Sequence, residues 1–110
     1  MELKTMKAMI HLLMWEFCPE GTEFYWLNDS CNAIGTCKCK YCKKLNEFYD
    51  FEIGISKKYA LNNSWEDVRR IAIQEIAHLR TMGNKNRNVY FDEFNRLMAL
   101  FEEPQNDKAA

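Results

Sequence analysis

The chain has 110 residues, of which 47% are hydrophobic and 28% are charged. This length allows one domain with a hydrophobic core but not two, and the composition is that of an ordinary globular protein. The formal net charge of -1 creates no global field toward nucleic acid or anionic membranes. The longest apolar stretch, residues 8–15, is too short to span a bilayer, and no signal-peptide cleavage site follows it. We therefore expect a cytoplasmic protein without membrane contact, whose cysteines are reduced.

The first half of the chain predicts one helix and three strands. Apolar residues recur at helical spacing over residues 2–17, which indicates an amphipathic helix. Aromatic and alternating patterns then predict strands over residues 22–27, 34–41 and 48–56. Residues 42–46 connect the second and third of these strands as a hairpin.

The second half predicts two more long helices. Residues 64–82 show helical spacing of apolar side chains, with Ser64 as the N-cap and Gly83 as the C-cap. After a polar loop, a last helix ends before Pro104.

Together these elements predict an α+β fold. We expect the N-terminal, central and C-terminal helices to pack on a small, mainly antiparallel sheet of three strands. The domain would cover residues 1–103, and residues 104–110 would form a disordered tail.

The central helix carries the segment Gln74-Glu75-Ile76-Ala77-His78. In the HExxH motif of zinc peptidases, two histidines four residues apart bind zinc and the glutamate between them activates a water molecule. Glu75 and His78 stand at the positions of the base and the second ligand. Gln74 stands at the first ligand position, and its amide binds zinc poorly. The alternative is a structural helix with a hydrogen-bonded core histidine and with Gln74 and Glu75 facing solvent.

The motif and its surroundings resemble the SprT-like metallopeptidase family, whose members include the Spartan-type proteases of DNA–protein crosslinks. The features that carry the resemblance over residues 22–101 are, in chain order, Trp26 on a strand, the turn Ala33-Ile34-Gly35-Thr36-Cys37, the strand end Ile53-Gly54-Ile55-Ser56, a short helix at residues 57–61 and the acid-bearing helix start Trp65-Glu66-Asp67-Val68. The turn departs from the family pattern by one residue inserted before its glycine. The resemblance implies a zincin-like fold with three zinc ligands.

This chain departs from the family at two of the three zinc ligands. The first ligand maps to Gln74, and the third, a histidine before the last helix, maps to Asn88. Catalytic zinc needs about three protein ligands and an open position for water, so one histidine and one glutamate are too few. Asn88 could equally be the N-cap of the last helix.

Four of the five cysteines, Cys31, Cys37, Cys39 and Cys42, lie within twelve residues. Thiolates at this spacing are the preferred ligands of a structural zinc ion, and neighbouring lysines lower thiol pKa values. We expect such a zinc site outside the motif cleft. The alternative is that Cys37 is a small core residue and the others are free thiols.

The same hairpin carries Lys38, Lys40, Lys43 and Lys44, with Tyr41 between them. Cations interleaved with an aromatic residue can hold phosphates and stack bases, which indicates weak contact with nucleic acid. The alternative is a solvated hairpin tip.

These observations favour a non-catalytic SprT-like domain that binds another protein or a ribonucleoprotein. The small size and the lysine- and asparagine-rich composition suggest an inhibitor of a host defence nuclease, encoded by a phage or a mobile element. The alternative function is a zinc-dependent endopeptidase with an atypical QExxH site, in which Glu75 is the general base and His78 a zinc ligand.

Overall fold

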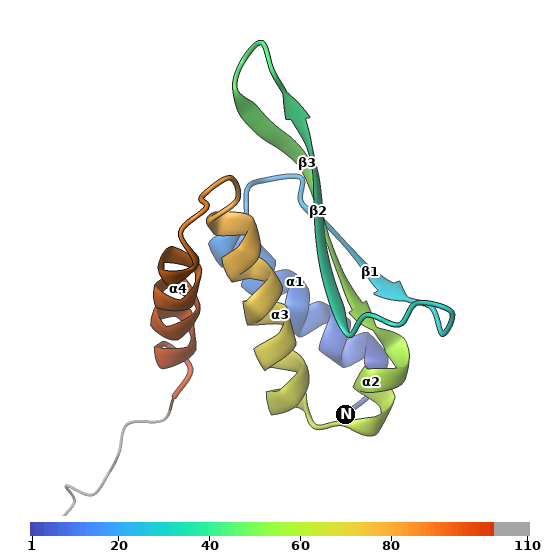
Figure 1. Cartoon of the computed structure of the whole chain (residues 1–110). Helices are drawn as coiled ribbons and strands as arrows, with labels where there is room; N and C mark the ends of the chain where they lie inside the picture. Colours follow the sequence, from blue (N-terminus) through green and yellow to red (C-terminus); the bar gives the residue numbers. More distant parts are fainter. Residues whose placement is uncertain (103–110) are drawn as a thin grey trace, which may run out of the picture.

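The computed structural model describes residues 1–102. Its elements are, in chain order, α1 (Leu3–Phe17), β1 (Glu23–Leu27), β2 (Gly35–Cys42), β3 (Glu47–Ser56), α2 (Lys57–Asn62), α3 (Trp65–Arg80) and α4 (Arg87–Ala99) (Figure 1). The α+β fold class is thereby confirmed, as is the short helix after the third strand. The expected tail, residues 104–110, lies outside the described residues.

The sheet is mixed, with strand order β1-β3-β2. β2 and β3 form the predicted antiparallel hairpin, whereas β1 runs parallel to β3. The expected mainly antiparallel sheet therefore needs this correction. β3 takes the central place because it carries Ile53 and Ile55, both 0% exposed. With β2 on one side of β3, only the other edge of β3 is left for β1.

The hydrophobic core lies between the sheet and two helices, α1 and α3, which both pack against it (Figure 1). Helix α1 contributes Met6, Ile10, Leu13 and Met14. Helix α3 contributes Val68, Ala72, Ile73, Ile76, Ala77 and Leu79. Phe24 of β1 lies beside Ile53 in the parallel register, so both side chains point into this core. The helical spacing in the sequence thus predicts the buried faces of both helices.

The ends of the last two long helices are set by local hydrogen bonds. Ser64 caps α3 as predicted, because its side chain accepts a hydrogen bond from the Asp67 N–H at 3.3 Å. The N-cap of α4 is Asn86, whose side-chain oxygen accepts from the Asn88 N–H at 3.0 Å. Asn88 is therefore in the first turn of α4 and is not its N-cap. Asn86 satisfies one of the free N–H groups at the helix start.

The far end of the hairpin projects beyond the helices (Figure 1). An irregularity in the register between Lys38 and Lys40 separates this end from the part of the hairpin that covers α3. Phe48 of the projecting part packs on Gly83, where an added Cβ would lie only 2.8 Å from the ring. The loop after α3 is thus held against the hairpin.

Candidate functional site

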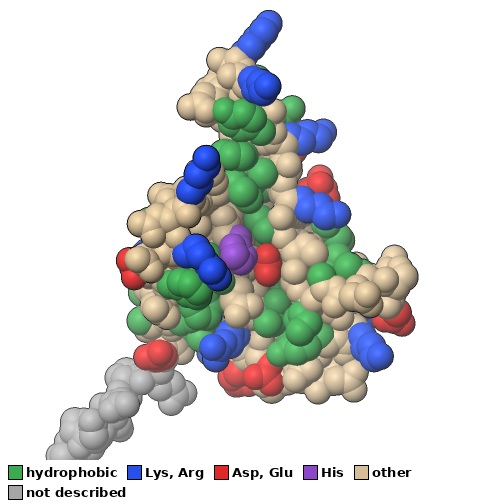
Figure 2. Space-filling view, in the orientation of Figure 1, with side chains coloured by type: hydrophobic (Ala, Val, Ile, Leu, Met, Phe, Trp, Pro, Cys, Tyr) green, Lys and Arg blue, Asp and Glu red, His purple; other side chains and the backbone are tan. Residues whose placement is uncertain are grey.

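A cleft of about 720 Å³ lies between β2, α3 and the loop that leads into α4. Glu75 and His78 come from α3, and residues 35–38 form the β2 side. The opposite side consists of the loop at residues 81–87 together with Tyr90 and Phe91. Figure 2 shows a histidine and an acidic side chain next to each other at the centre of this face, with basic side chains around them. The structure thus brings together the two motif residues predicted to be neighbours.

Glu75 packs closely against the start of β2. A methyl group at Gly35 would lie 2.8 Å from Ile71 Cγ2 and 2.9 Å from Glu75 Oε2. Only a residue without a side chain allows α3 to approach β2 this closely. Burial raises the pKa of Glu75 to about 7. A carboxyl group with this pKa can take up and release a proton near neutral pH.

His78 is exposed, and its ring stacks on the ring of Tyr90. The ring centroids lie 4.0 Å apart, with an angle of 12° between the planes. Burial lowers the pKa of His78, so the imidazole is neutral at neutral pH. Burial also raises the pKa of Tyr90, and the charge of Glu75 adds to this effect. One face of the histidine ring is therefore already occupied.

The residues around Glu75 and His78 do not fit the zinc ion that the family resemblance implies. Gln74 is half-buried and Asn88 is exposed, and neither lines the cleft. Within residues 1–102, no group of three or more His, Cys, Asp or Glu side chains is placed to hold a metal ion. The donor set at this position is one imidazole and one carboxylate, fewer than catalytic zinc requires.

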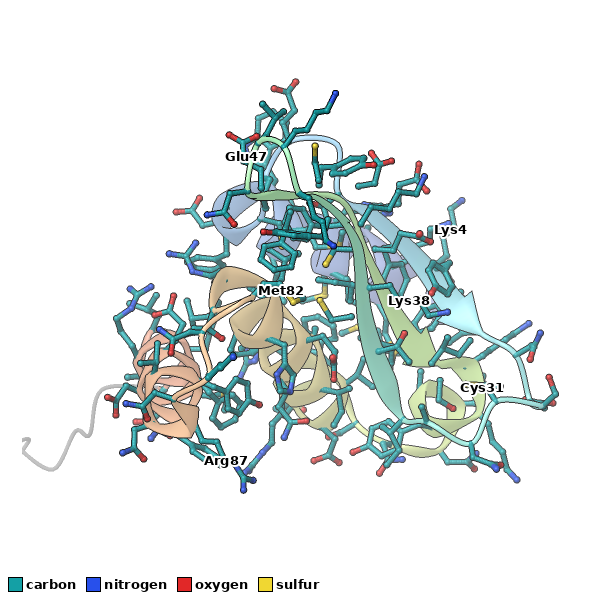
Figure 3. The ribbon with its side chains drawn as sticks, turned by 45° about the horizontal axis from the view of Figure 1, so that its top comes forward. Lys4, Cys31, Lys38, Glu47, Met82 and Arg87 are labelled. Atoms are coloured by element: carbon teal, nitrogen blue, oxygen red, sulfur yellow. The ribbon has the colours of Figure 1, made fainter. Side chains whose placement is uncertain are left out.

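The structure does not bring the four hairpin cysteines together. Cys37 and Cys39 lie half-buried on β2, whereas Cys31 is exposed in the loop before that strand. Cys42 ends β2 opposite Glu47, about 16 Å from Cys37 at the rise of a strand. Figure 3 shows Cys31 and Glu47 at opposite ends of the hairpin. The expected four-cysteine zinc site is not assembled in this arrangement.

The chemistry of Cys37 also differs from the expectation. Burial raises the pKa of its thiol to about 12, and the charge of Glu75 and the thiols of Cys39 and Cys18 act in the same direction. The expected lowering of this thiol pKa by neighbouring lysines is therefore wrong. Burial raises the pKa of the Cys18 thiol, at the end of α1, to about 11, although the charge of Arg80 acts in the opposite direction. Both thiols are protonated and behave as small core side chains.

The four lysines of the hairpin do not form one patch. Lys38 is on the β2 side of the cleft. Lys40 forms an exposed ion pair with Asp50 at 3.3 Å, and Lys43 and Lys44 lie in the turn at the hairpin tip. Tyr41 is engaged within the hairpin, where its hydroxyl donates to Asn46. The long hairpin separates lysines that lie close together in the sequence.

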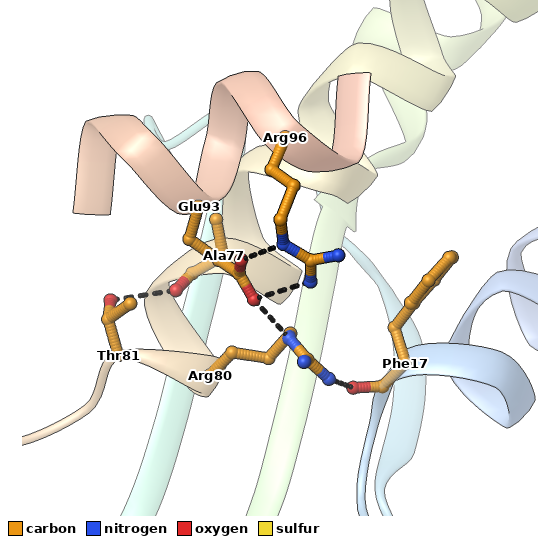
Figure 4. Close-up of polar contacts among 6 residues, drawn as sticks. All are labelled: Phe17, Ala77, Arg80, Thr81, Glu93 and Arg96. Carbon is orange, nitrogen blue, oxygen red and sulfur yellow. Dashed lines mark hydrogen bonds and ion pairs between the residues drawn. The ribbon is translucent and has the colours of Figure 1, made fainter. Parts of the chain in front are cut away.

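The far wall of the cleft is tied to the rest of the fold by an ion-pair cluster (Figure 4). Arg80, the last residue of α3, donates to Glu93 of α4 and, at 2.8 Å, to the carbonyl oxygen of Phe17. Arg96 donates to both carboxylate oxygens of Glu93, at 2.7 and 3.1 Å. These contacts connect α1, α3 and α4 and so fix the position of the α4 start.

Lys85 was not singled out in the sequence, and Arg87, Tyr90 and Phe91 were not assigned to the cleft. These four residues belong to the loop and the first turns of α4. Their only sequence signal is their position directly after the motif helix, because the loop path depends on the distant contact between Phe48 and Gly83.

Comparison of the chain with family models, with curated proteins and with solved structures gives no match. In residues 1–102, no helix combines the length and the apolar character that crossing a membrane requires.

Proposed function

We propose that this chain is a non-catalytic, SprT-like domain that binds an extended segment of another protein in its cleft. The observation that carries the proposal is the edge of β2. The strand order places β2 at the side of the sheet, and its outer edge borders the cleft. An edge strand presents unpaired N–H and C=O groups, which an incoming strand can pair with.

The register identifies the main-chain groups that an incoming strand would meet. The Ser56 N–H donates to the Ile34 carbonyl oxygen at 2.8 Å, so Ile34 faces β3. Because antiparallel pairs alternate between the two edges, Thr36 and Lys38 also face β3. Gly35 and Cys37 then direct their N–H and C=O groups to the outer edge. A bound segment would run beside them, above Glu75 and His78.

The donor set supports binding without hydrolysis. Peptide hydrolysis by an HExxH-type site uses zinc as Lewis acid and as the source of the nucleophile. Gln74 and Asn88 stand where this chemistry needs imidazoles. Tyr90, stacked on His78, also fills space beside the remaining imidazole.

A selection from a display library of random peptides tests the proposal. We expect wild-type protein to select peptides that bind in an extended form and are recovered intact after prolonged incubation, as judged by mass spectrometry. N-methylation at alternate residues of a selected peptide removes the donors needed for strand pairing and should abolish binding. Binding that survives N-methylation, or cleavage of the selected peptides, would contradict the proposal.

The alternative function, a QExxH endopeptidase, is favoured by one observation. Glu75 lies in the cleft with a pKa of about 7, which suits a general base. In that case, wild-type protein supplied with zinc would cleave an unfolded protein substrate, and Glu75→Gln would lose activity by about 100-fold or more. Equal cleavage by wild type and Glu75→Gln would assign the activity to a contaminant.

The inhibition of a host defence nuclease remains a prediction about the identity of the partner. It is tested by adding the purified chain to such a nuclease. Dose-dependent loss of nuclease activity supports it, and unchanged activity at excess protein contradicts it.

A further inference from the structure

We infer that the segment bound in the cleft is acidic and that Lys85 and Arg87 select it. This inference rests on the proposed function, since it names the class of partner for the same cleft. It follows from the distribution of charge around the cleft and from the observation that no ion pair to these cations forms within residues 1–102.

The charges that border the cleft are mostly positive. Lys85 and Arg87 are exposed, and neither forms an ion pair within residues 1–102. Residues 81–91 contain no aspartate or glutamate. The first turn of α4, which carries the positive end of the helix dipole, also has no acidic residue. Only Glu75 is acidic among the cleft residues.

The positions of these charges suit an extended ligand. Lys85 and Arg87 lie on the side of the cleft opposite β2. Lys38 lies beside Glu52 in the strand register, so its side chain points away from the face of β2 on which Cys37 meets α3. A segment paired with the β2 edge would therefore have one positive side next to it. Glu75 is half-buried against Gly35, below that path. Positive potential along this side attracts acidic side chains and disfavours basic ones.

The same cations could attract a single-stranded nucleic acid, but two features favour a peptide. One face of the His78 ring is already covered by Tyr90. The free main-chain groups of β2 match a polypeptide strand and have no counterpart in a nucleic acid.

Fluorescence anisotropy with three labelled probes tests the inference. The probes are a short peptide with glutamate at alternate positions, the same peptide with lysine at those positions, and single-stranded oligothymidine. We expect wild-type protein to bind the glutamate peptide most tightly, with affinity that falls as salt is added. The double variant Lys85→Glu with Arg87→Glu should weaken this binding by about tenfold or more.

The matched control is Lys4→Glu with Lys7→Glu on α1, which makes the same change of net charge outside the cleft. This control should bind like wild type. Equal or tighter binding of the lysine peptide would overturn the charge preference while leaving the proposed protein-binding function intact. Tighter binding of oligothymidine would assign the cations to phosphate. The inference would also be overturned if the Lys85→Glu, Arg87→Glu variant bound the glutamate peptide as tightly as wild type does. It would likewise be overturned if wild-type protein did not bind this peptide.

Discussion

Glu75 is a cleft residue whose burial makes the stability of the fold depend on pH. Its pKa of about 7 lies above the ordinary value of 4.5 because burial penalises the charged form. The folded state therefore keeps the proton between these pH values, whereas the unfolded state loses it. This group thus makes the fold less stable as the pH rises from 4.5 to 7, and the loss is complete above pH 7.

Glu75→Gln removes this effect and should stabilise the protein at alkaline pH. We expect the free energy of unfolding at pH 8 to rise by about 1–2 kcal/mol relative to wild type. Near pH 4 the two proteins should differ little, because the wild-type carboxyl group is then protonated in both states. Urea denaturation at the two pH values measures this. A stability difference that does not change with pH would show that Glu75 is not buried in this way.

Gly35 is a second cleft residue that affects stability, because only glycine fits between β2 and α3 at this position. Gly35→Ala should destabilise the protein by about 1–3 kcal/mol, because the new methyl group would overlap Ile71 and Glu75. Thermal denaturation measures the loss. Ile71→Ala in the same chain removes one of the two overlaps, so the two changes together should cost less than the sum of their separate effects. Strict additivity would contradict the close approach of α3 to β2.

At the scale of elements, the cleft depends on how α4 is held against α3. Glu93 is the centre of this contact, and its side chain is only 15% exposed. The hydrogen bond from Arg96 lowers its pKa to about 2, and Arg80 acts in the same direction. Because the folded-state pKa is lowered, this stabilisation is complete above pH 4.5 and is lost as the pH falls from 4.5 to 2.

Glu93→Gln should therefore lower the free energy of unfolding at pH 7 by about 1–2 kcal/mol. The difference from wild type should shrink between pH 4.5 and 2. Asp92→Asn is the matched control, since Asp92 is exposed, adjacent in the chain and outside the cluster. Equal effects of the two substitutions would show that the loss reflects net charge rather than the contacts of Glu93.

Elements with a local signal could be predicted from the sequence, and those set by distant contacts could not. The helical spacing before and after Ser64 predicts α1 and α3, and the hairpin follows from alternation on either side of a polar turn. The parallel pairing of β1 has no local signal, because it depends on which strand fills the centre of the sheet. For α4, both Asn86 and Asn88 suit an N-cap, and only the folded loop decides between them.

In the candidate site, too, local features could be predicted from the sequence and features set by distant contacts could not. Glu75 and His78 lie one turn apart on one helix, so their proximity is a local property and could be predicted. The structure separates the members of the cysteine and lysine sets, because residues close in sequence become distant along an extended hairpin. Lys85 and Arg87 joined the site only through the folding of a loop.

For the molecule as a whole, residues 1–102 contain no group of three or more His, Cys, Asp or Glu side chains placed to hold a metal ion. We expect a chelator to leave the melting temperature of wild-type protein unchanged. Cys39→Ser with Cys42→Ser should respond to the chelator in the same way as wild type, because Cys42 lies too far along the strand to share an ion with Cys37. A chelator-induced drop in melting temperature that disappears in the double variant would restore the cysteine zinc site.

We propose that the cleft between β2 and α3 binds a partner without catalytic zinc. The most direct test is the zinc content of the purified protein after saturation with zinc and removal of the free ion, compared between wild type and His78→Ala. We predict the same content in both, well below one ion per chain, because one imidazole and one carboxylate cannot hold the ion. One zinc ion per wild-type chain that is lost in His78→Ala would contradict this account.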